Sequence, residues 1–175
     1  MGKLKIQMEI VMDLTAIKRN YMMRNLALVI TIVMFISCDS SIVFEEYKSF
    51  ENQKWNTDSA AFFNYAITDT TSFNIVKIKL RHTVEYEFQN LFLFIETDVI
   101  DTVELMLANK EGMWLGSGIG DVREFEFEYQ NAKLFSKKGN YSIKIEQAMR
   151  YGMAEKIQVL NNVLAVGLSI EKQNE

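Results

Sequence analysis

The chain carries one thiol, Cys38, and one imidazole, His82, in 175 residues. Cys38 ends an apolar segment, residues 26–36, that follows the positively charged Arg24. Ser37, directly before Cys38, is the small residue that a signal peptidase requires before its cut. A basic flank, a short apolar segment and a small residue are the layout of a secretory signal. The apolar segment is shorter than the roughly 20 residues that span a bilayer.

The position of Cys38 predicts lipid chemistry at its sulfur. Phe35-Ile36-Ser37-Cys38 resembles a bacterial lipobox, in which the cysteine thiol forms a thioether with a diacylglyceryl group and becomes the new N-terminus. Phe35 departs from this pattern, since leucine, valine or isoleucine is usual at that position. The alternative is that residues 26–37 form a buried core element and Cys38 is an ordinary buried thiol. The basic flank and the polar residues 39–41 favour lipid attachment.

Residues 1–21 precede this signal and contain Glu9 and Asp13, which are unusual ahead of the apolar segment of a secretory signal. We interpret them as an over-extended start or n-region and exclude them from the fold. The remaining chain divides into a lipoprotein signal peptide at 22–37, a tether and lead-in segment at 38–58, and one β-sandwich domain at 59–175.

Composition excludes several classes of partner. From Cys38 onward the chain has 138 residues, of which 14 are basic and 21 acidic, a formal charge of −7. A domain with this charge lacks the basic face that phosphate contacts need, so we expect no nucleic acid as partner. The net charge gives no attraction to anionic lipid, so the lipid on Cys38 is expected to provide the membrane contact. Once Cys38 is modified no thiol remains, which excludes disulfides and cysteine-based metal sites.

Short segments of alternating apolar and polar residues follow one another from residue 60. Apolar and polar residues alternate strictly in segment 124–129, which indicates a strand with one solvent-exposed face. Segment 91–98 is almost continuously apolar, as in a central strand of a sandwich. This predicts an all-β fold, an antiparallel β-sandwich of jelly-roll or immunoglobulin type, and strand count favours the jelly roll. In the lead-in segment, residues 42–47 could form a short helical turn or a first strand. The other expected strands cover residues 60–67, 72–82, 91–98, 102–108, 124–129, 139–148 and 163–171.

The sequence contains no recognisable arrangement of catalytic residues. His82 falls near a strand end, where we expect it to be exposed, and no nucleophile is fixed beside it. The glycine-rich segment 116–121 lacks the Lys-Ser/Thr ending and the following helix of a phosphate-binding loop. Its glycines are expected to serve positive φ or close packing, with positive φ at Gly118 and with Trp114 packed into the body. We therefore expect no catalytic residues, no cofactor, no small-molecule substrate and no enzymatic activity.

Carboxylates gather in two places. Segment 96–101 contains three acidic residues with the oxygen chemistry that calcium prefers, but the spacing matches no defined calcium loop, so no metal site is predicted. Glu124, Glu126 and Glu128 share one face of an expected strand, where like charges repel and a solvated face is expected. A docking face for a basic partner is the alternative.

Four aromatic residues in or near loops form the candidate partner or ligand surface: Tyr47, Trp55, Trp114 and Tyr151. Exposed aromatics on a sandwich stack on sugars or anchor a protein partner. Core packing is the competing interpretation for the two tryptophans, and Trp55 is expected to pin the lead-in segment to the body. A line of coplanar exposed aromatics would favour sugar binding, whereas a contiguous apolar patch would favour a protein partner.

Several segments, taken together, resemble the GldH family of gliding-motility lipoproteins of Bacteroidetes-type bacteria. The resemblance covers the chain from about Met22 onward, and its most specific parts are Trp-Leu-Gly-x-Gly-x-Gly-Asp and Gln-Ala-Met-Arg. The absence of proline departs from these relatives. The segments are 38–40, 43–48, 90–94, 112–121, 139–143, 146–150 and 166–172.

The resemblance implies a lipid-anchored envelope protein required for gliding, without catalytic activity or cofactor. Cys38 is the only residue whose role carries over, and the implied partners are other gliding or secretion proteins of the envelope. In the first few residues after Cys38 only Asp39 is acidic. An acidic cluster of the kind associated with surface export is thus missing, and we expect a periplasm-facing anchor. The predicted function is an accessory protein of the gliding machinery that binds other proteins, and the alternative is a carbohydrate-binding envelope lipoprotein.

Overall fold

A computed structural model describes residues 41–152 and 155–173 of the chain. The interpretations of residues 1–21, of the signal peptide at 22–37 and of Cys38 therefore concern residues outside the described part. Within the described part, no helix has the length and apolar character needed to cross a bilayer. A short 3-10 turn, η1 (Glu51–Gln53), follows the first strand. The strands are β1 (Ile42–Ser49), β2 (Lys54–Asn56), β3 (Ala61–Ile67), β4 (Asn74–Thr83), β5 (Asn90–Glu96), β6 (Ile100–Met106), β7 (Val122–Lys133), β8 (Gly139–Gln147), β9 (Arg150–Tyr151), β10 (Glu155–Lys156), β11 (Val159–Asn161) and β12 (Val163–Lys172).

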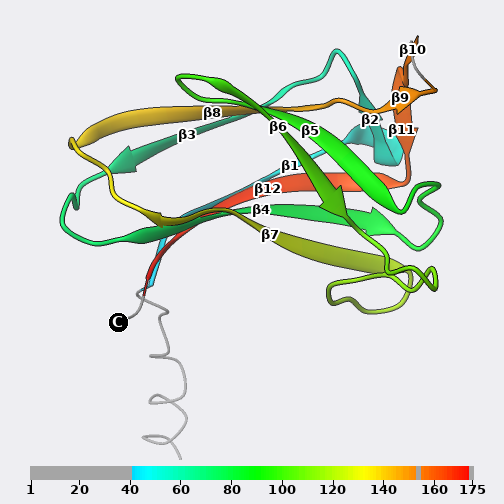
Figure 1. The fold of residues 1–175 in the computed structure, drawn as a ribbon, viewed down its shortest axis with the longest axis horizontal. Helices are drawn as coiled ribbons and strands as arrows, with labels where there is room; N and C mark the ends of the chain where they lie inside the picture. Colours follow the sequence, from blue (N-terminus) through cyan, green and yellow to red (C-terminus); the bar gives the residue numbers. More distant parts are fainter. Residues whose placement is uncertain (1–40, 153–154, 174–175) are drawn as a thin grey trace, which may run out of the picture. The chain divides into compact units, whose positions relative to one another are not determined.

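Two four-stranded antiparallel sheets form the body: sheet I has the order β1-β12-β4-β7, and sheet II has the order β3-β8-β5-β6. Figure 1 shows them as two layers. The strand pairs are nested, because β5 pairs with β6, β4 with β7, β3 with β8, β2 with β11 and β1 with β12. The first half of the chain therefore folds back on the second half in reverse order. Eight main strands in this arrangement form a jelly roll, which confirms the predicted all-β sandwich.

The core lies between the two sheets and follows the alternation within each strand. In β4, Val76, Ile78 and Leu80 point inward, and every second residue of β5 from Leu91 to Ile95 is fully buried. Burial of each such aliphatic side chain contributes about 1.5–3 kcal/mol to folding. The residues between them in β5 are half-buried, so β5 has one buried face despite its almost continuous apolar sequence.

The lead-in segment belongs to the sandwich, which corrects the predicted boundary at residue 59. β1 pairs with β12 along its length, from Ile42 opposite Glu171 to Ser49 opposite Ala165. β2 pairs with β11. The structure decides between the two alternatives left open for residues 42–47 in favour of a strand. The sequence did not decide because β1 is an edge strand, and its Glu-Glu-Tyr-Lys stretch at 45–48 places polar residues on both faces. The seven predicted strands correspond to β3 to β8 and β12.

The sandwich has two ends that carry different loops. At the Ser41 end, β1 begins, β12 finishes, and loops 68–73 and 134–138 connect strands. At the other end, the glycine loop (residues 107–121) connects β6 to β7. Figure 1 shows the Ser41 end at the left and the glycine loop at the right.

Candidate binding surfaces

The four predicted surface aromatics do not form one surface. Trp55 is fully buried in β2, and Trp114 is half-buried in the glycine loop. Tyr47 is half-buried on the outer face of sheet I, whereas Tyr151 in β9 is 80% exposed. Only Tyr151 therefore offers a free ring, and the four side chains make no common stacking platform.

Trp55 is a core residue that holds the lead-in segment against the body, as one of the two interpretations predicted. It is not part of a partner surface. Its ring stacks on Phe50 with ring centroids 4.6 Å apart. Its indole Nε1 donates a hydrogen bond to the carbonyl oxygen of Ser59 at 2.9 Å. These contacts tie the segment between β1 and β3 to the core and satisfy the indole donor.

Tyr47 braces the outer face of sheet I. Its ring covers Gly167, where an added Cβ would lie 2.7 Å from the ring carbons. The guanidinium carbon of Arg81 lies 3.9 Å from the ring centroid. The Tyr47 hydroxyl donates to Glu124 Oε2 at 3.2 Å. Partial burial and the neighbouring Glu124 carboxylate raise the pKa of Tyr47, so the hydroxyl stays protonated at neutral pH.

The acidic row on β7 is largely neutralised by cations of β4. Arg81 pairs with Glu124. Lys79 lies 3.3 Å from Glu126 and 2.6 Å from Glu45 of β1. Within the described residues, Glu128 takes part in no ion pair. The outer face of sheet I is thus a solvated lattice of internal ion pairs. Glu128 alone of the acidic row keeps an unpaired charge, which is little for a basic partner to bind.

The glycine loop is fixed against β7 by its backbone. Ser117 and Glu124 exchange two backbone hydrogen bonds, of 3.0 and 2.7 Å. A Cβ at Gly116 would lie 2.2 Å from the carbonyl oxygen of Glu124, and one at Gly118 would lie 2.0 Å from that of Val122. Gly116 has the expected positive φ, at +85°. The positive φ predicted for Gly118 is wrong, because this glycine is required by close approach to the backbone of β7 alone. The glycines therefore serve backbone geometry, as predicted, and β7 follows the loop where a phosphate-binding loop would need a helix.

A buried aromatic cluster supports the loop from below. His82 is fully buried, which corrects the expectation of an exposed strand-end histidine. Its ring centroid lies 4.7 Å from that of Trp114 and 5.6 Å from that of Tyr86. The sequence contained the signal for this burial. Residue 82 follows Ile78 and Leu80 at two-residue spacing in β4, so its side chain points to the same inward face.

The environment of His82 is structural and not that of a general base. Its Nδ1 lies 2.8 Å from the carbonyl oxygen of Thr83, which assigns the proton to Nδ1. Nε2 is buried and has no hydrogen-bond partner. Burial lowers the pKa of His82 and outweighs the opposing effect of the Thr83 contact, while the positive Arg123 lowers the pKa further. The neutral imidazole therefore packs as an aromatic ring.

Above this cluster the glycine loop exposes three apolar side chains. Ile119 is 93% exposed and Met113 is 63% exposed, while Leu115 is 37% exposed. Asn109 shapes the turn that carries Met113, because its Oδ1 accepts hydrogen bonds from the backbone N–H groups of Glu111 and Met113. These three residues were not predicted as a surface from the sequence. Their signal was the insertion of large apolar residues between glycines in a segment predicted to be a loop.

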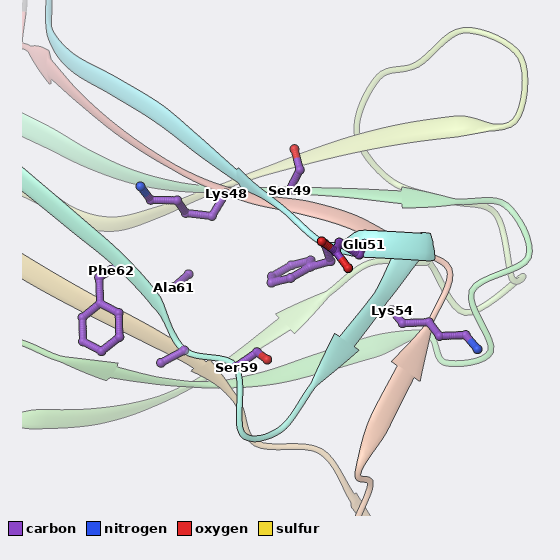
Figure 2. A pocket seen from close by; sticks show the side chains of 9 residues that line it. Lys48, Ser49, Glu51, Lys54, Ser59, Ala61 and Phe62 are labelled. Carbon is purple, nitrogen blue, oxygen red and sulfur yellow. The ribbon is translucent and has the colours of Figure 1, made fainter.

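An open pocket lies between the end of β1 and the start of β3, with a volume of about 490 Å³. Figure 2 shows Lys48 and Lys54 on its rim, with their ammonium groups pointing away from each other. Lys48 pairs with Glu46. Because its charges do not converge, the pocket has no arrangement that would fix a small ligand. Among the residues with described side chains, no group of three or more potential metal-ligating side chains occurs.

The strand order places the chain among the jelly-roll β-sandwich proteins. Residues 42–170, from β1 to the end region of β12, match the GldH lipoprotein family. The chain belongs to this family of lipoproteins. It is 35% identical over 153 residues to the gliding motility lipoprotein GldH homolog of Christiangramia forsetii, covering 83% of this chain and 93% of that protein. It is 32% identical over 154 residues to the gliding motility lipoprotein GldH of Flavobacterium johnsoniae, covering 84% and 95%.

Among solved structures, the chain is similar to the VP2 subviral particle of infectious bursal disease virus, at 15% identity and a TM-score of 0.30. That match covers 76% of this chain and 34% of the viral chain, so the chain spans about a third of that protein. A second match is the coat protein of tobacco streak virus, at 10% identity and a TM-score of 0.27, covering 80% of this chain and 92% of that one.

Proposed function

We propose that this chain is a lipid-anchored accessory protein of the gliding-motility machinery, and that it acts by binding another protein of the cell envelope. Cys38 carries the anchor, and the glycine loop is the contact surface. The names of two relatives that align with most of this chain support the gliding role.

The observation that carries the binding role is the exposure of Ile119 and Met113 on a loop with a fixed backbone. Large apolar side chains held out in water by a rigid support lose little conformational entropy on binding. Loops positioned by a rigid scaffold are also where recognition residues concentrate. A protein partner with an apolar recess would bury both side chains.

Binding without catalysis is supported by the state of the one imidazole. His82 is enclosed by Tyr86 and Trp114, and its Nδ1 is engaged with Thr83. A group in this position cannot reach a substrate without opening the core. Sugar binding has less support, since the predicted aromatics are divided among the core, the outer face of sheet I and β9.

The binding role is tested by Ile119→Asp and Met113→Asp in the full chain. The matched control is Val99→Asp, because Val99 is also 63% exposed but lies in the β5–β6 turn. Each variant is expressed at equal level and scored for cell movement and for proteins that co-purify from detergent-solubilised envelope. We expect the glycine-loop variants to lose both, and Val99→Asp to keep both. Equal behaviour of all three variants would contradict the assigned surface.

The anchor is tested by mass spectrometry of the mature N-terminus. We expect a diacylglyceryl-modified Cys38 and, in Cys38→Ala, a chain without lipid, because no other thiol can form the thioether. We further propose that the anchored domain faces the periplasm. Protease added to intact cells should then spare the domain, and protease added after opening the outer membrane should remove it.

A further inference from the structure

The Ser41 end of the sandwich exposes apolar side chains from three different segments. Phe73 in loop 68–73 is 51% exposed, Leu134 in loop 134–138 is 47% exposed, and Ile42 at the start of β1 is 40% exposed. These segments meet at one end because Asn74 pairs with both Lys172 and Lys133 in sheet I. Figure 1 shows both loops at the left end, where β1 begins.

The charge at this end differs in sign from the net charge of the domain. Lys137 and Lys138 are exposed beside Leu134, and neither belongs to an ion pair within the described residues. Two acidic groups nearby already have cationic partners: Asp69 binds Lys172 at 2.8 Å and Glu171 binds Lys77 at 2.7 Å. Asp98, which lines the same pocket as Lys133, has no ion pair within the described residues. Lys133, Lys137 and Lys138 outnumber this carboxylate, so the net charge next to the exposed apolar side chains is positive.

The two loops are held in place by the domain. Asp69 accepts hydrogen bonds from the Thr71 backbone and hydroxyl and from the Ser72 hydroxyl, at 2.8–2.9 Å. Gln173 donates its backbone N–H to the Phe73 carbonyl oxygen at 2.9 Å. In the other loop, the Tyr141 hydroxyl donates to the Lys137 carbonyl oxygen at 2.7 Å. Phe73 and the lysines are thus presented by a fixed frame.

The anchor assigned above brings a membrane close to this end. The backbone N–H of Lys172 donates to the Ser41 carbonyl oxygen at 2.7 Å, so the chain is fixed to the sandwich at residue 41. Only three residue steps separate Ser41 from Cys38, and an extended chain covers at most about 11 Å over that length. A lipid on Cys38 therefore keeps the Ser41 end within reach of the headgroups.

We propose that the Ser41 end docks directly onto the surface of a membrane that contains anionic lipid. Phe73, Leu134 and Ile42 enter the boundary between headgroups and acyl chains, and Lys137 and Lys138 contact lipid phosphates. Aromatic and aliphatic side chains flanked by lysines are the composition that binds at this depth. The contact fixes the orientation of the domain, and the glycine loop at the opposite end then points away from the bilayer. This inference rests on the lipid anchor of the proposed function.

The test uses the lipidated full chain in vesicles and one introduced cysteine, since Cys38 is the only natural thiol and is consumed by the lipid. Ser136→Cys places a fluorophore beside Leu134, and the control Lys110→Cys places one in the glycine loop. Both positions are exposed. In vesicles of phosphatidylcholine and phosphatidylglycerol that contain a lipid-borne quencher, we expect several-fold stronger quenching at position 136. Equal quenching, or stronger quenching at position 110, would overturn the docking contact.

Two further arms separate the components of the contact. Lys137→Glu with Lys138→Glu should lower quenching at position 136 to the level seen in phosphatidylcholine alone, and Phe73→Ser should lower it in both kinds of vesicle. Quenching that both sets of changes leave unaltered would also overturn the proposal. Mass spectrometry of the same preparation separates the two inferences: an unmodified Cys38 removes the anchor itself, whereas a lipid-modified Cys38 with equal quenching overturns only the docking contact.

Discussion

The glycine loop and the outer face of sheet I are held in place by different kinds of contact, although they share Glu124. The Glu124 backbone pairs with Ser117 of the loop, while its carboxylate accepts from Tyr47 and Arg81 on the outer face. The loop lies against the backbone of β7 through Gly116 and Gly118. The outer face is held by side chains that can move. We therefore expect substitutions of Gly116 and Gly118 to destabilise the domain more than substitutions on the outer face, where side chains can move aside.

The largest effect is expected for Gly118→Ala. The added Cβ would lie 2.0 Å from the Val122 carbonyl oxygen, which cannot move without breaking the end of β7. We expect a loss of about 3 kcal/mol in the free energy of unfolding, measured by denaturant titration. The control is Gly120→Ala, because Gly120 has φ of +62° but no atom within 4 Å of its added Cβ. A loss at Gly118 no larger than at Gly120 would contradict the backbone contact.

A smaller loss, of about 1–2 kcal/mol, is expected for Gly167→Ala on the outer face. Here the added Cβ meets the Tyr47 ring at 2.7 Å, and a side chain can turn away. The decisive measurement is a double-mutant cycle with Tyr47→Ala, in which the Gly167→Ala loss should largely disappear. Additive losses would show that Tyr47 is not the obstacle.

Acid should destabilise the glycine-loop end through His82. Burial lowers the pKa of His82 in the folded chain, so the unfolded chain binds a proton near pH 6.5 while the folded chain remains neutral. Stability from this group is complete above pH 6.5 and declines as the pH falls from there toward the folded pKa, by at most about 1.4 kcal/mol per pH unit. His82→Asn cannot titrate and keeps a donor for Thr83. Unfolding curves at pH 7 and pH 5 should therefore differ less for His82→Asn than for the natural chain, and an equal difference would exclude His82 as the source.

The smallest effect is expected for Glu126→Gln. Glu126 lies 3.3 Å from Lys79 and 3.8 Å from Lys77, but its side chain is 46% exposed. Exposed ion pairs are screened by water and salt, so the loss should be about 0.5 kcal/mol and should diminish further at high salt. A loss comparable to that of Gly118→Ala would mean that the ion-pair lattice, and not backbone contact, dominates the stability of sheet I.

The alternation of apolar and polar residues predicted the fold well, because most strands bury one face. It identified β3 to β8 and β12, and the buried parity of β4 would also have placed His82 inside. It left β1 open between a short helical turn and a strand, because the solvent exposure of this edge strand removes the alternating pattern. The candidate site was less predictable. Residue type alone could not distinguish the buried ring of Trp55 from the free ring of Tyr151, because Trp55 is buried where β2 pairs with the distant β11, whereas Tyr151 lies in a local hairpin of β9 and β10.

The exposure of Ile119 could not be predicted from the sequence for a related reason. Its position follows from backbone contacts between the glycine loop and β7, and a glycine-rich sequence does not say which strand it will lie against. The neutralisation of the acidic row likewise required the register that places Lys79 opposite Glu126. Sequence supplied the residue types, but the partner of each residue came from strand register.

The nested pairing also governs when the domain can take shape during synthesis. β12 is the last main strand to leave the ribosome, yet it lies in the interior of sheet I between β1 and β4. Until residue 172 has been made, β1 has no neighbour in its sheet and one side of β4 is open. A partly synthesised chain therefore cannot complete sheet I, and the two halves of the domain can close on each other only once β12 has been made.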